Sequence, residues 1–150
     1  MRVIIQRVLQ ASVAIDGEIK SSIGNGLLIF LGIEESDVSE DVEWLVGKIS
    51  RLRIFDDSSG VMNLSVQEIN GEMLVISQFT LHATVKKGNR PSYIHAAKPE
   101  IAIPIYQEFL RTLKNISELN IFSGEFGADM KVNLLNDGPV TIFIDSKNRE

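Results

Sequence analysis

Short apolar runs rich in β-branched and aromatic residues dominate this chain, and two longer stretches with helical spacing interrupt them. Residues 38–52 and 99–114 carry apolar side chains three or four positions apart, as in an amphipathic helix with one buried face. The order strands, helix, strands, helix, strands predicts an α/β fold in one domain, residues 1–150. We expect a mainly antiparallel, partly barrel-like β-sheet with the helices packed outside. Strict strand–helix alternation and a glycine-rich phosphate loop are missing, which argues against a doubly wound nucleotide-binding fold.

Turn residues delimit the expected strands. Asp16-Gly17 and Asn70-Gly71 are hairpin signals, because both dipeptides tolerate the backbone angles of tight turns. Residues 27–31 and 73–76 are continuous apolar runs typical of buried strands. Arg7 lies within the first strand pattern, where an arginine is usually a solvated residue of the outer face.

Six acidic side chains crowd residues 34–43, at the start of the first helix. Acids in a first turn suit the helix dipole, and Ser36 or Asp37 is the expected N-cap. Their spacing does not converge on one face, so we interpret them as helix start and solvated surface and not as a metal site. Pro99 fits the start of the second helix, whereas Pro104 costs that helix one hydrogen bond unless it lies in the first turn.

Composition narrows the possible chemistry. The chain has no cysteine and only two histidines, which argues against disulfides, a thiolate nucleophile or a histidine-rich metal site, so we expect no metal and no cofactor. No apolar run approaches the ~20 residues that span a membrane, and the first residues lack a signal-peptide pattern. We therefore expect a cytoplasmic protein without a membrane partner. The net charge of −5 argues against nucleic-acid binding by the whole surface and leaves room for a local basic face.

A glycine–proline pair stands near the C-terminus, in Asn136-Asp137-Gly138-Pro139-Val140-Thr141. It separates two runs of strand character, residues 130–135 and 140–145. Its ordinary interpretation is a hairpin connection between them. A rigid turn of this kind also fixes the direction of its carbonyl oxygens, since proline freezes φ.

A second stretch, Ser77-Gln78-Phe79-Thr80-Leu81, follows the buried run 73–76. Ser77 and Thr80 are candidate hydroxyl groups. If the strand continues, Thr80 and His82 share a face and could form a hydroxyl–histidine pair. Such residues more often satisfy backbone groups, and the residues alone leave both interpretations open.

Charge is distributed unevenly around this stretch. Residues 73–99 contain no aspartate or glutamate but hold Lys86, Lys87, Arg90 and Lys98. A basic loop beside a strand end suits a phosphate backbone, because lysine and arginine displace its condensed counterions. A solubilising loop would have the same composition, and charge alone does not decide between the two.

The two stretches together resemble the signature pair of the D-aminoacyl-tRNA deacylases, also called D-tyrosyl-tRNA deacylases. Other segments fall in the family's order over nearly the whole chain: Ile5-Gln6-Arg7-Val8, Ala11-Ser12-Val13, Gly26-Leu27-Leu28, Arg53-Ile54-Phe55, Met62-Asn63-Leu64, Arg90-Pro91-Ser92 and Phe126-Gly127-Ala128-Asp129-Met130. His82 stands where a small residue is expected, so we assign it no role, and Pro104 also departs from the family's helix.

The resemblance implies hydrolysis of the ester that joins a D-amino acid to the terminal adenosine of tRNA, a step of translation quality control. It also implies a homodimer with the active site at the subunit interface, where Gly138-Pro139, a cis pair in the family, enters the partner's pocket. The carbonyl oxygens of this pair would crowd an L side chain and leave a D side chain free. Glycine has hydrogen in both directions, so glycyl-tRNA, including glycine mischarged on tRNA-Ala, should also be cleaved.

Site residues follow from the same resemblance. The catalytic positions are Ser77, Gln78, Phe79 and Thr80. Arg7 and Asn136 support the glycine–proline turn, and Arg7 is expected to hold it by a hydrogen bond to a carbonyl across or near the subunit interface. The residues expected to contact the acceptor end of tRNA are Lys86, Lys87, Arg90, Phe126 and Met130. Phe126 and Met130 would pack on the terminal adenine, although burial in the core is an equal alternative for both.

Two mechanisms remain open at this point. Thr80 is either the nucleophile, or backbone N–H groups around residues 78–80 bind the oxyanion while the tRNA 2′-hydroxyl assists. We favour the second, because no convincing base accompanies Thr80. Two other classes of protein also stay open, a non-catalytic dimeric amino-acid-binding module and a general esterase of small substrates.

Overall fold

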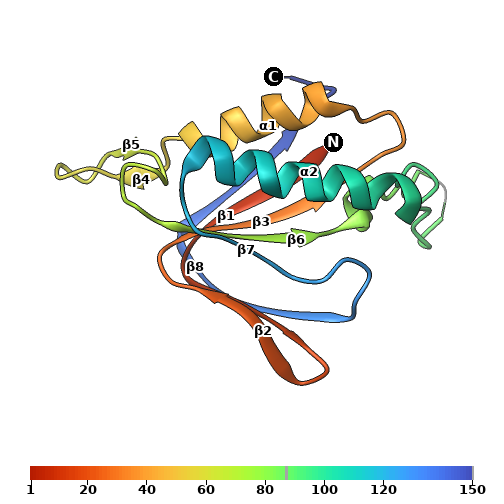
Figure 1. Cartoon of the computed structure of the whole chain (residues 1–150), viewed down its shortest axis with the longest axis horizontal. Coiled ribbons are helices and arrows are strands. Elements are labelled where there is room, and N and C mark those ends of the chain that lie inside the picture. The colour runs from red at the N-terminus through yellow and green to blue at the C-terminus, as the bar shows by residue number, and fades with distance from the viewer. Residues whose placement is uncertain (87, 150) are drawn as a thin grey trace.

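A single mixed β-sheet forms the body of the protein. The computed structural model describes residues 1–86 and 88–149. Six strands form the sheet in the order β2-β1-β3-β6-β7, with β8 also paired to β1 (Figure 1). Their bounds are β1 Arg2–Ile15, β2 Glu18–Ile23, β3 Gly26–Gly32, β6 Glu72–Ser77, β7 Ile121–Ser123 and β8 Met130–Asp145. A separate two-stranded ribbon consists of β4 Phe55–Asp56 and β5 Met62–Leu64.

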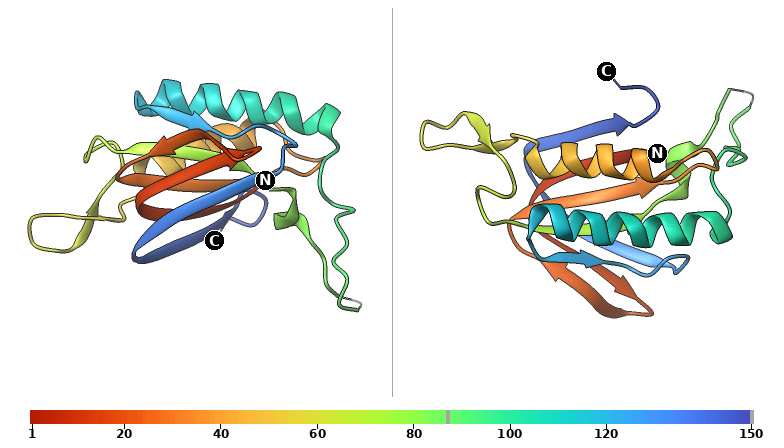
Figure 2. Two further views of the ribbon diagram at one scale, coloured as in Figure 1. Left: turned by 90° about the horizontal axis from the view of Figure 1, so that it is seen from below. Right: turned by 45° about the horizontal axis from the view of Figure 1, so that its top comes forward.

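Strand β1 organises this sheet. Its first half lies between β3 and β8 and its second half between β2 and β8, all antiparallel. Changing partners along one strand curls the sheet into a partly closed barrel, which confirms the expected architecture (Figure 2). Strand β6 is parallel to both β3 and β7, because a helix lies between β6 and each of these neighbours in the chain.

Both helices cover the same face of the sheet (Figure 2). They are α1, Ser39–Arg51, and α2, Pro99–Ser117. The main core lies between them and the sheet, where α1 contributes Val42, Leu45, Val46 and Ile49 and α2 contributes Phe109, all fully buried. A second, smaller core fills the opposite, concave side of the sheet and includes Val8, Val13, Leu28 and Leu74. In the described part of the chain, no helix is long and apolar enough to span a membrane.

The acidic cluster before α1 differs from the expectation. The N-cap is Val38, and the Asp41 carboxylate accepts the Val38 N–H at 3.0 Å, so neither Ser36 nor Asp37 caps the helix. Asp37 is buried and accepts hydrogen bonds from the Met1 ammonium and from the Glu34 N–H. Two members of the cluster are therefore buried structural groups, and the rest are surface residues.

Two turn signals have different outcomes. Asp16-Gly17 closes the β1–β2 hairpin with φ values of 51° and 83°, as predicted. Asn70 also has a positive φ, 50°, but the hairpin expected there is wrong, because β6 leaves the turn to pair in parallel with β3.

Pro104 lies inside α2 and beyond its first turn, so the helix does lose the hydrogen bond that a proline cannot donate.

Candidate active site

The end of β6 delivers the first group of candidate residues. The Gln78 N–H donates to the Leu31 carbonyl at 2.7 Å and continues the pairing with β3. Beyond it the chain turns into a short 3-10 helix, η1, Phe79–His82. Thr80 and His82 therefore do not share a strand face, and the hydroxyl–histidine pair considered above is wrong.

This turn leaves two backbone donors without acceptors. Among the hydrogen bonds of residues 1–86 and 88–149, none uses the N–H of Phe79 or of Thr80. The first N–H groups of any helical turn lack an internal partner. The Gln78 N–H is already engaged, so only two of the three amides considered above can receive a developing negative charge.

The Thr80 hydroxyl accepts a hydrogen bond from a neighbouring side-chain amide. The donor is the Gln78 side chain, at 2.6 Å. His82 is buried, and both of its ring nitrogens lack a hydrogen-bond partner among the described residues. Burial lowers the pKa of His82, so the imidazole is neutral near pH 7. Among the described residues, no hydrogen bond joins the Thr80 hydroxyl to a group that could remove its proton.

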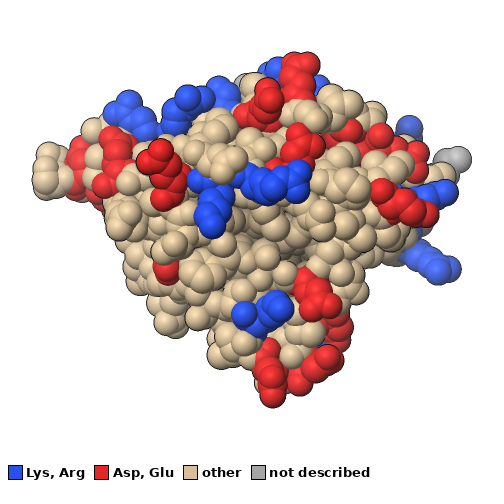
Figure 3. Space-filling view, viewed as in Figure 1, with Lys and Arg blue, Asp and Glu red and all other residues tan. Residues whose placement is uncertain are grey.

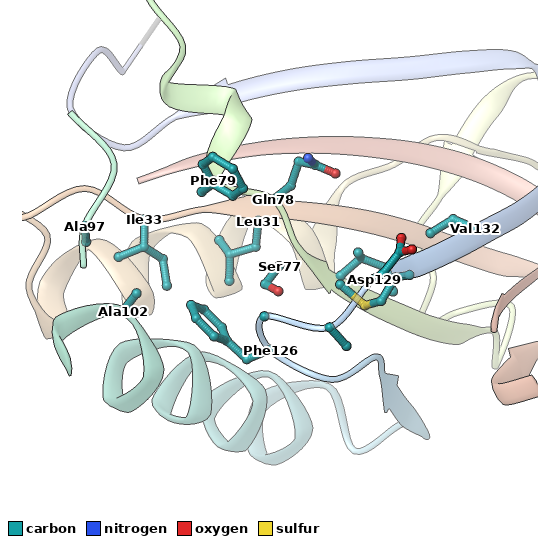
Figure 4. Close-up of a pocket in the computed structure, with 14 residues that line it drawn as sticks. Leu31, Ile33, Ser77, Gln78, Phe79, Ala97, Ala102, Phe126, Asp129 and Val132 are labelled. Carbon is teal, nitrogen blue, oxygen red and sulfur yellow. The ribbon is translucent and has the colours of Figure 1, made fainter. Parts of the chain in front are cut away.

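A largely apolar pocket of about 250 Å³ opens next to this turn (Figure 4). Its walls come from the end of β6, the start of α2 and the segment that leads into β8. They include Leu31, Ile33, Ser77, Gln78, Phe79, Ala102, Phe126, Asp129, Met130 and Val132. Both Phe126 and Met130 line the pocket, and each also packs against one of the cores. Partial burial against a core is therefore shown for both residues, and their contact with an adenine stays a prediction.

Close contacts shape the pocket wall. Met130 lies over Gly124, where a Cβ would come within 2.3 Å of the Met130 sulfur. The Phe126 ring packs at 5.8 Å from the Tyr106 ring, and the buried Tyr106 hydroxyl donates to the Val75 carbonyl at 2.9 Å. Sequence reasoning assigned no role to Tyr106 or Asp129, since a helix-face tyrosine and a surface carboxylate carry no distinctive signal.

The glycine–proline pair is not a hairpin turn. Strand β8 runs unbroken through it and pairs with β1 on both sides, with irregular register between Gln6 and Gln10. The Gly138–Pro139 peptide bond is cis, and both residues are exposed. The predicted break is thus an outward bulge in one long strand, because pairing with β1 outweighs the local turn signal.

Arg7 anchors this bulge from within the same chain. The Arg7 side chain is buried, and its Nε lies 3.2 Å from the Asp137 carbonyl and 3.0 Å from the Asp137 carboxylate. Its Nη1 donates to the Ile54 carbonyl at 2.7 Å and lies 3.3 Å from the Asp56 carboxylate. The solvated position that is usual for a strand arginine is wrong here. Neither Ile54 nor Asp56 had a sequence signal that pointed to this contact.

Asn136 and Gly138 complete the anchor. The Asn136 side-chain amide donates to the Arg7 carbonyl and to the Val140 carbonyl, both at 3.0 Å, and so ties the two sides of the bulge together. Gly138 has φ 116°, and a Cβ there would lie 2.9 Å from Arg7 Nη2 and 2.9 Å from Val140 Cγ2. Only glycine fits both the backbone angle and the space.

The bulge at Gly138-Pro139 lies apart from the turn after β6, which consists of Gln78 and η1 and is called the β6 turn below. Along β1, Val3 pairs with Leu31, which in turn pairs with Ser77, whereas Val8 pairs with Asn136. Five residues of strand separate the two positions, or roughly 17 Å at about 3.4 Å per residue. One copy of the chain therefore does not bring Gly138 to its own Thr80.

The described residues of the basic segment, 84–86 and 88–98, form an arm beyond the β6 turn. Thr84 and Ser92 make an antiparallel bridge, and Lys86 and Arg90 are exposed near its tip, at an end of the molecule with projecting basic side chains (Figure 3). Lys87 lies outside the described residues. In the described part of the chain, no three His, Cys, Asp or Glu side chains are grouped closely enough to hold a metal ion.

Comparison with known proteins gives one consistent result. A family model described as D-Tyr-tRNA(Tyr) deacylase matches residues 4–145. Proteins named D-aminoacyl-tRNA deacylase from Bacteroides thetaiotaomicron and Flavobacterium johnsoniae are 64% and 61% identical to this chain, with full coverage of both chains in each comparison.

Two solved structures share the fold. A structure described as "c-Myc DNA Unwinding Element Binding Protein" is 43% identical, with a TM-score of 0.91 over 97% of this chain and 98% of its own. A structure described as "a probable eukaryotic D-amino acid tRNA deacylase" is 16% identical, with a TM-score of 0.82 over 95% of this chain and 97% of its own.

Proposed function

Since the chain belongs to the D-Tyr-tRNA(Tyr) deacylase family and is a D-aminoacyl-tRNA deacylase, we propose that its β6 turn carries the chemistry and its β8 bulge the choice of hand. The observation that carries the proposal is the pair of unpartnered N–H groups at Phe79 and Thr80, beside the apolar pocket. They form a preorganised site for an oxyanion, and the pocket has room for a nucleobase.

Substrate binding starts from the pocket. The terminal adenine enters between Phe126 and Met130, where an aromatic ring and a soft thioether give stacking and packing surface. This places the ribose ester near the strand end, with its carbonyl oxygen toward the N–H groups of Phe79 and Thr80. Ser77 and Gln78 line the same wall and position the ester.

Hydrolysis then requires no side-chain nucleophile. The 2′-hydroxyl of the terminal ribose assists a water molecule, whose oxygen forms a bond to the carbonyl carbon. The two N–H groups stabilise the resulting oxyanion. The bond from that carbon to the ribose oxygen breaks and the ribose oxygen takes a proton, which releases tRNA and the free D-amino acid. Thr80 orients Gln78 through their hydrogen bond and does not attack.

A second copy of the chain supplies the chiral gate. Gly138 and Pro139 are exposed and too distant to serve their own β6 turn, so they reach the pocket of a partner in a homodimer. Exposed apolar side chains flank the bulge on the paired strands, with Leu9 at 50%, Leu135 at 49% and Phe143 at 58% exposure. Exposed apolar side chains on both sides of the bulge suit contact with another protein surface.

Selection acts by exclusion. With the α-amino group and the ester fixed, the gate crowds one of the two remaining directions at the α-carbon. An L side chain collides with the carbonyl oxygens of Gly138 and Pro139, whereas a D side chain points away from them. Glycine has no side chain to exclude, so we propose that glycyl-tRNA, including glycine on tRNA-Ala, is also cleaved.

The arm receives the tRNA backbone. Lys86 and Arg90 stand on a segment without acidic residues, and such a segment attracts phosphates although the whole chain is negative. We include Lys87 on sequence grounds alone. Because aminoacyl-tRNA is the substrate, we place the enzyme in the cytoplasm, with a role in the quality control of translation.

A panel of substrates tests this function against its two rivals. We expect rapid hydrolysis of D-aminoacyl-tRNA and of glycyl-tRNA, slow hydrolysis of L-aminoacyl-tRNA, and little action on a free D-amino-acid ester. Activity on the free ester would favour a general esterase of small substrates. No hydrolysis at all would favour a dimeric amino-acid-binding module.

The dimer has a separate test. Phe143→Asp places a charge in the exposed apolar surface beside the gate, so we expect sedimentation to report half the mass of the wild type. Because the gate then leaves the partner's pocket, the ratio of D- to L-aminoacyl-tRNA hydrolysis should fall. A wild-type protein that sediments as a monomer while keeping its selectivity contradicts the proposed gate.

A further inference from the structure

Two exposed aromatic rings lie together at the mouth of the pocket. Phe79 is 57% exposed and Tyr93 is 40% exposed, and their ring centroids lie 5.0 Å apart with the planes at 75°. Phe79 belongs to the β6 turn and Tyr93 to the arm, so their ring contact joins the turn to the arm. Figure 4 shows Phe79 at the pocket. The proposed mechanism uses neither ring, since only the backbone of Phe79 takes part in it.

The surroundings of this pair suit a nucleic acid. Phe79 lines the pocket and is more than half exposed, so its side chain borders both the cavity and the solvent. The Tyr93 ring, on the arm, contacts the Phe79 ring. The tip of the arm carries Lys86 and Arg90. No acidic residue occurs between Glu72 and Glu100 in the sequence. Aromatic rings combined with a basic, acid-free segment are typical of surfaces that bind single strands.

We propose that the Phe79–Tyr93 pair stacks the nucleotide that precedes the terminal adenosine of the tRNA acceptor end. The inference rests on the proposed function, because it takes the adenine to occupy the pocket. The next base then leaves at the pocket mouth and meets the aromatic pair, while its phosphate faces the lysine and arginine of the arm. Stacking does not depend on base identity, since every base has a π-face.

A second copy of the chain is the other candidate to cover these rings. The arm carries only positive charge over residues 84–98, and a negatively charged strand complements it better than the edge of another protein surface. The pair therefore extends the site along the tRNA, from the adenine pocket to the phosphates.

Three substrates that differ only in length test the proposal: the same D-amino acid on adenosine, on a cytidine–adenosine dinucleotide and on tRNA. For the wild type we expect kcat/KM to rise from the first substrate to the second. Tyr93→Ala should lose roughly 5- to 150-fold on the dinucleotide and on tRNA and leave the adenosine ester unchanged. Tyr93→Phe should retain wild-type values. Ile19→Ala removes a side chain that is 70% exposed on β2 and serves as the matched control.

Other results would overturn the proposal. An equal loss on all three substrates means that Tyr93 only supports the β6 turn, and a change in sedimenting mass means that it contacts a second copy. Binding of an uncharged cytidine–cytidine–adenosine trinucleotide, followed by fluorescence anisotropy of a label on the RNA, separates this inference from the function. Weaker binding by Tyr93→Ala supports the stacking site even if no ester is cleaved, and unchanged binding refutes it even if the deacylase is active.

Discussion

Replacement of Arg7 by methionine should loosen the bulge that presents Gly138 and Pro139. Methionine keeps an apolar stem of similar length, so the change removes the guanidinium and little packing. The buried Ile54 carbonyl then loses a donor at 2.7 Å and the Asp137 carbonyl loses one at 3.2 Å. A buried group left without its partner costs about 1–3 kcal/mol. The Asp56 and Asp137 carboxylates are 51% and 35% exposed, so water replaces much of their pairing.

The two carbonyls together would cost about 2–6 kcal/mol, and we expect about 3–5 kcal/mol, the range for breaking a buried charged contact. For a chain of this size that corresponds to a fall in Tm of about 6–20 °C. Urea unfolding measures the loss of free energy and thermal unfolding the fall in Tm. Arg53→Met is the matched control, because Arg53 is exposed and makes one hydrogen bond to the Asn63 carbonyl. The Arg53→Met change should lower the free energy of unfolding by about 1 kcal/mol or less.

The same substitution should affect selectivity. At a temperature where Arg7→Met is folded, the ratio of D- to L-aminoacyl-tRNA hydrolysis should fall by about tenfold or more, since ~1.4 kcal/mol of lost exclusion already gives that factor. Arg7→Lys should lie between, because one ammonium cannot reach both carbonyls in the geometry of the guanidinium. A methionine variant with wild-type stability and an unchanged ratio would refute the proposed anchor.

Three further outcomes follow from the site. Thr80→Ala should lower kcat by about tenfold or less, the value of one neutral hydrogen bond, whereas a loss of about 1000-fold, or ~4 kcal/mol, with an intact fold would make Thr80 the nucleophile. Lys86→Glu should flatten the salt dependence of tRNA binding by about one unit of log–log slope relative to Lys20→Glu on β2, and an unchanged slope removes Lys86 from the interface. Burial lowers the pKa of His82 in the folded state, so the unfolded chain binds more protons below its own pKa of about 6.5 and the free energy of unfolding falls as the pH drops through that value. His82→Leu should reduce this fall between pH 7.5 and 5.5, and an unchanged pH profile would exclude His82 as its source.

Local signals in the sequence predicted most elements of the fold. Asp16-Gly17, the buried runs that became β3 and β6, and the apolar stripes of α1 and α2 each depend on residues close in the chain. The glycine–proline stretch shows where such signals fail. The pair has the chemistry of a turn, but β8 continues through it because its partner β1 lies about 130 residues earlier in the chain. No short-range pattern records that pairing.

The site shows the same division. The position of residues 77–80 at a strand end could be predicted from the buried run before them. The 3-10 turn that separates Thr80 from His82 could not, since it depends on β3 ending at Gly32 and on the last pairing bond at Gln78. The buried contacts of Arg7 were also out of reach, because the carbonyl of Ile54 belongs to another part of the chain.

The most direct test of the chiral gate compares glycyl, D-alanyl and L-alanyl esters of one and the same tRNA. If the gate only excludes side chains of one hand, the glycyl and D-alanyl esters should be cleaved at similar kcat/KM and the L-alanyl ester far more slowly. Glycyl cleavage as slow as L-alanyl cleavage would mean that the enzyme recognises the D side chain itself, and equal rates for all three would mean that there is no gate.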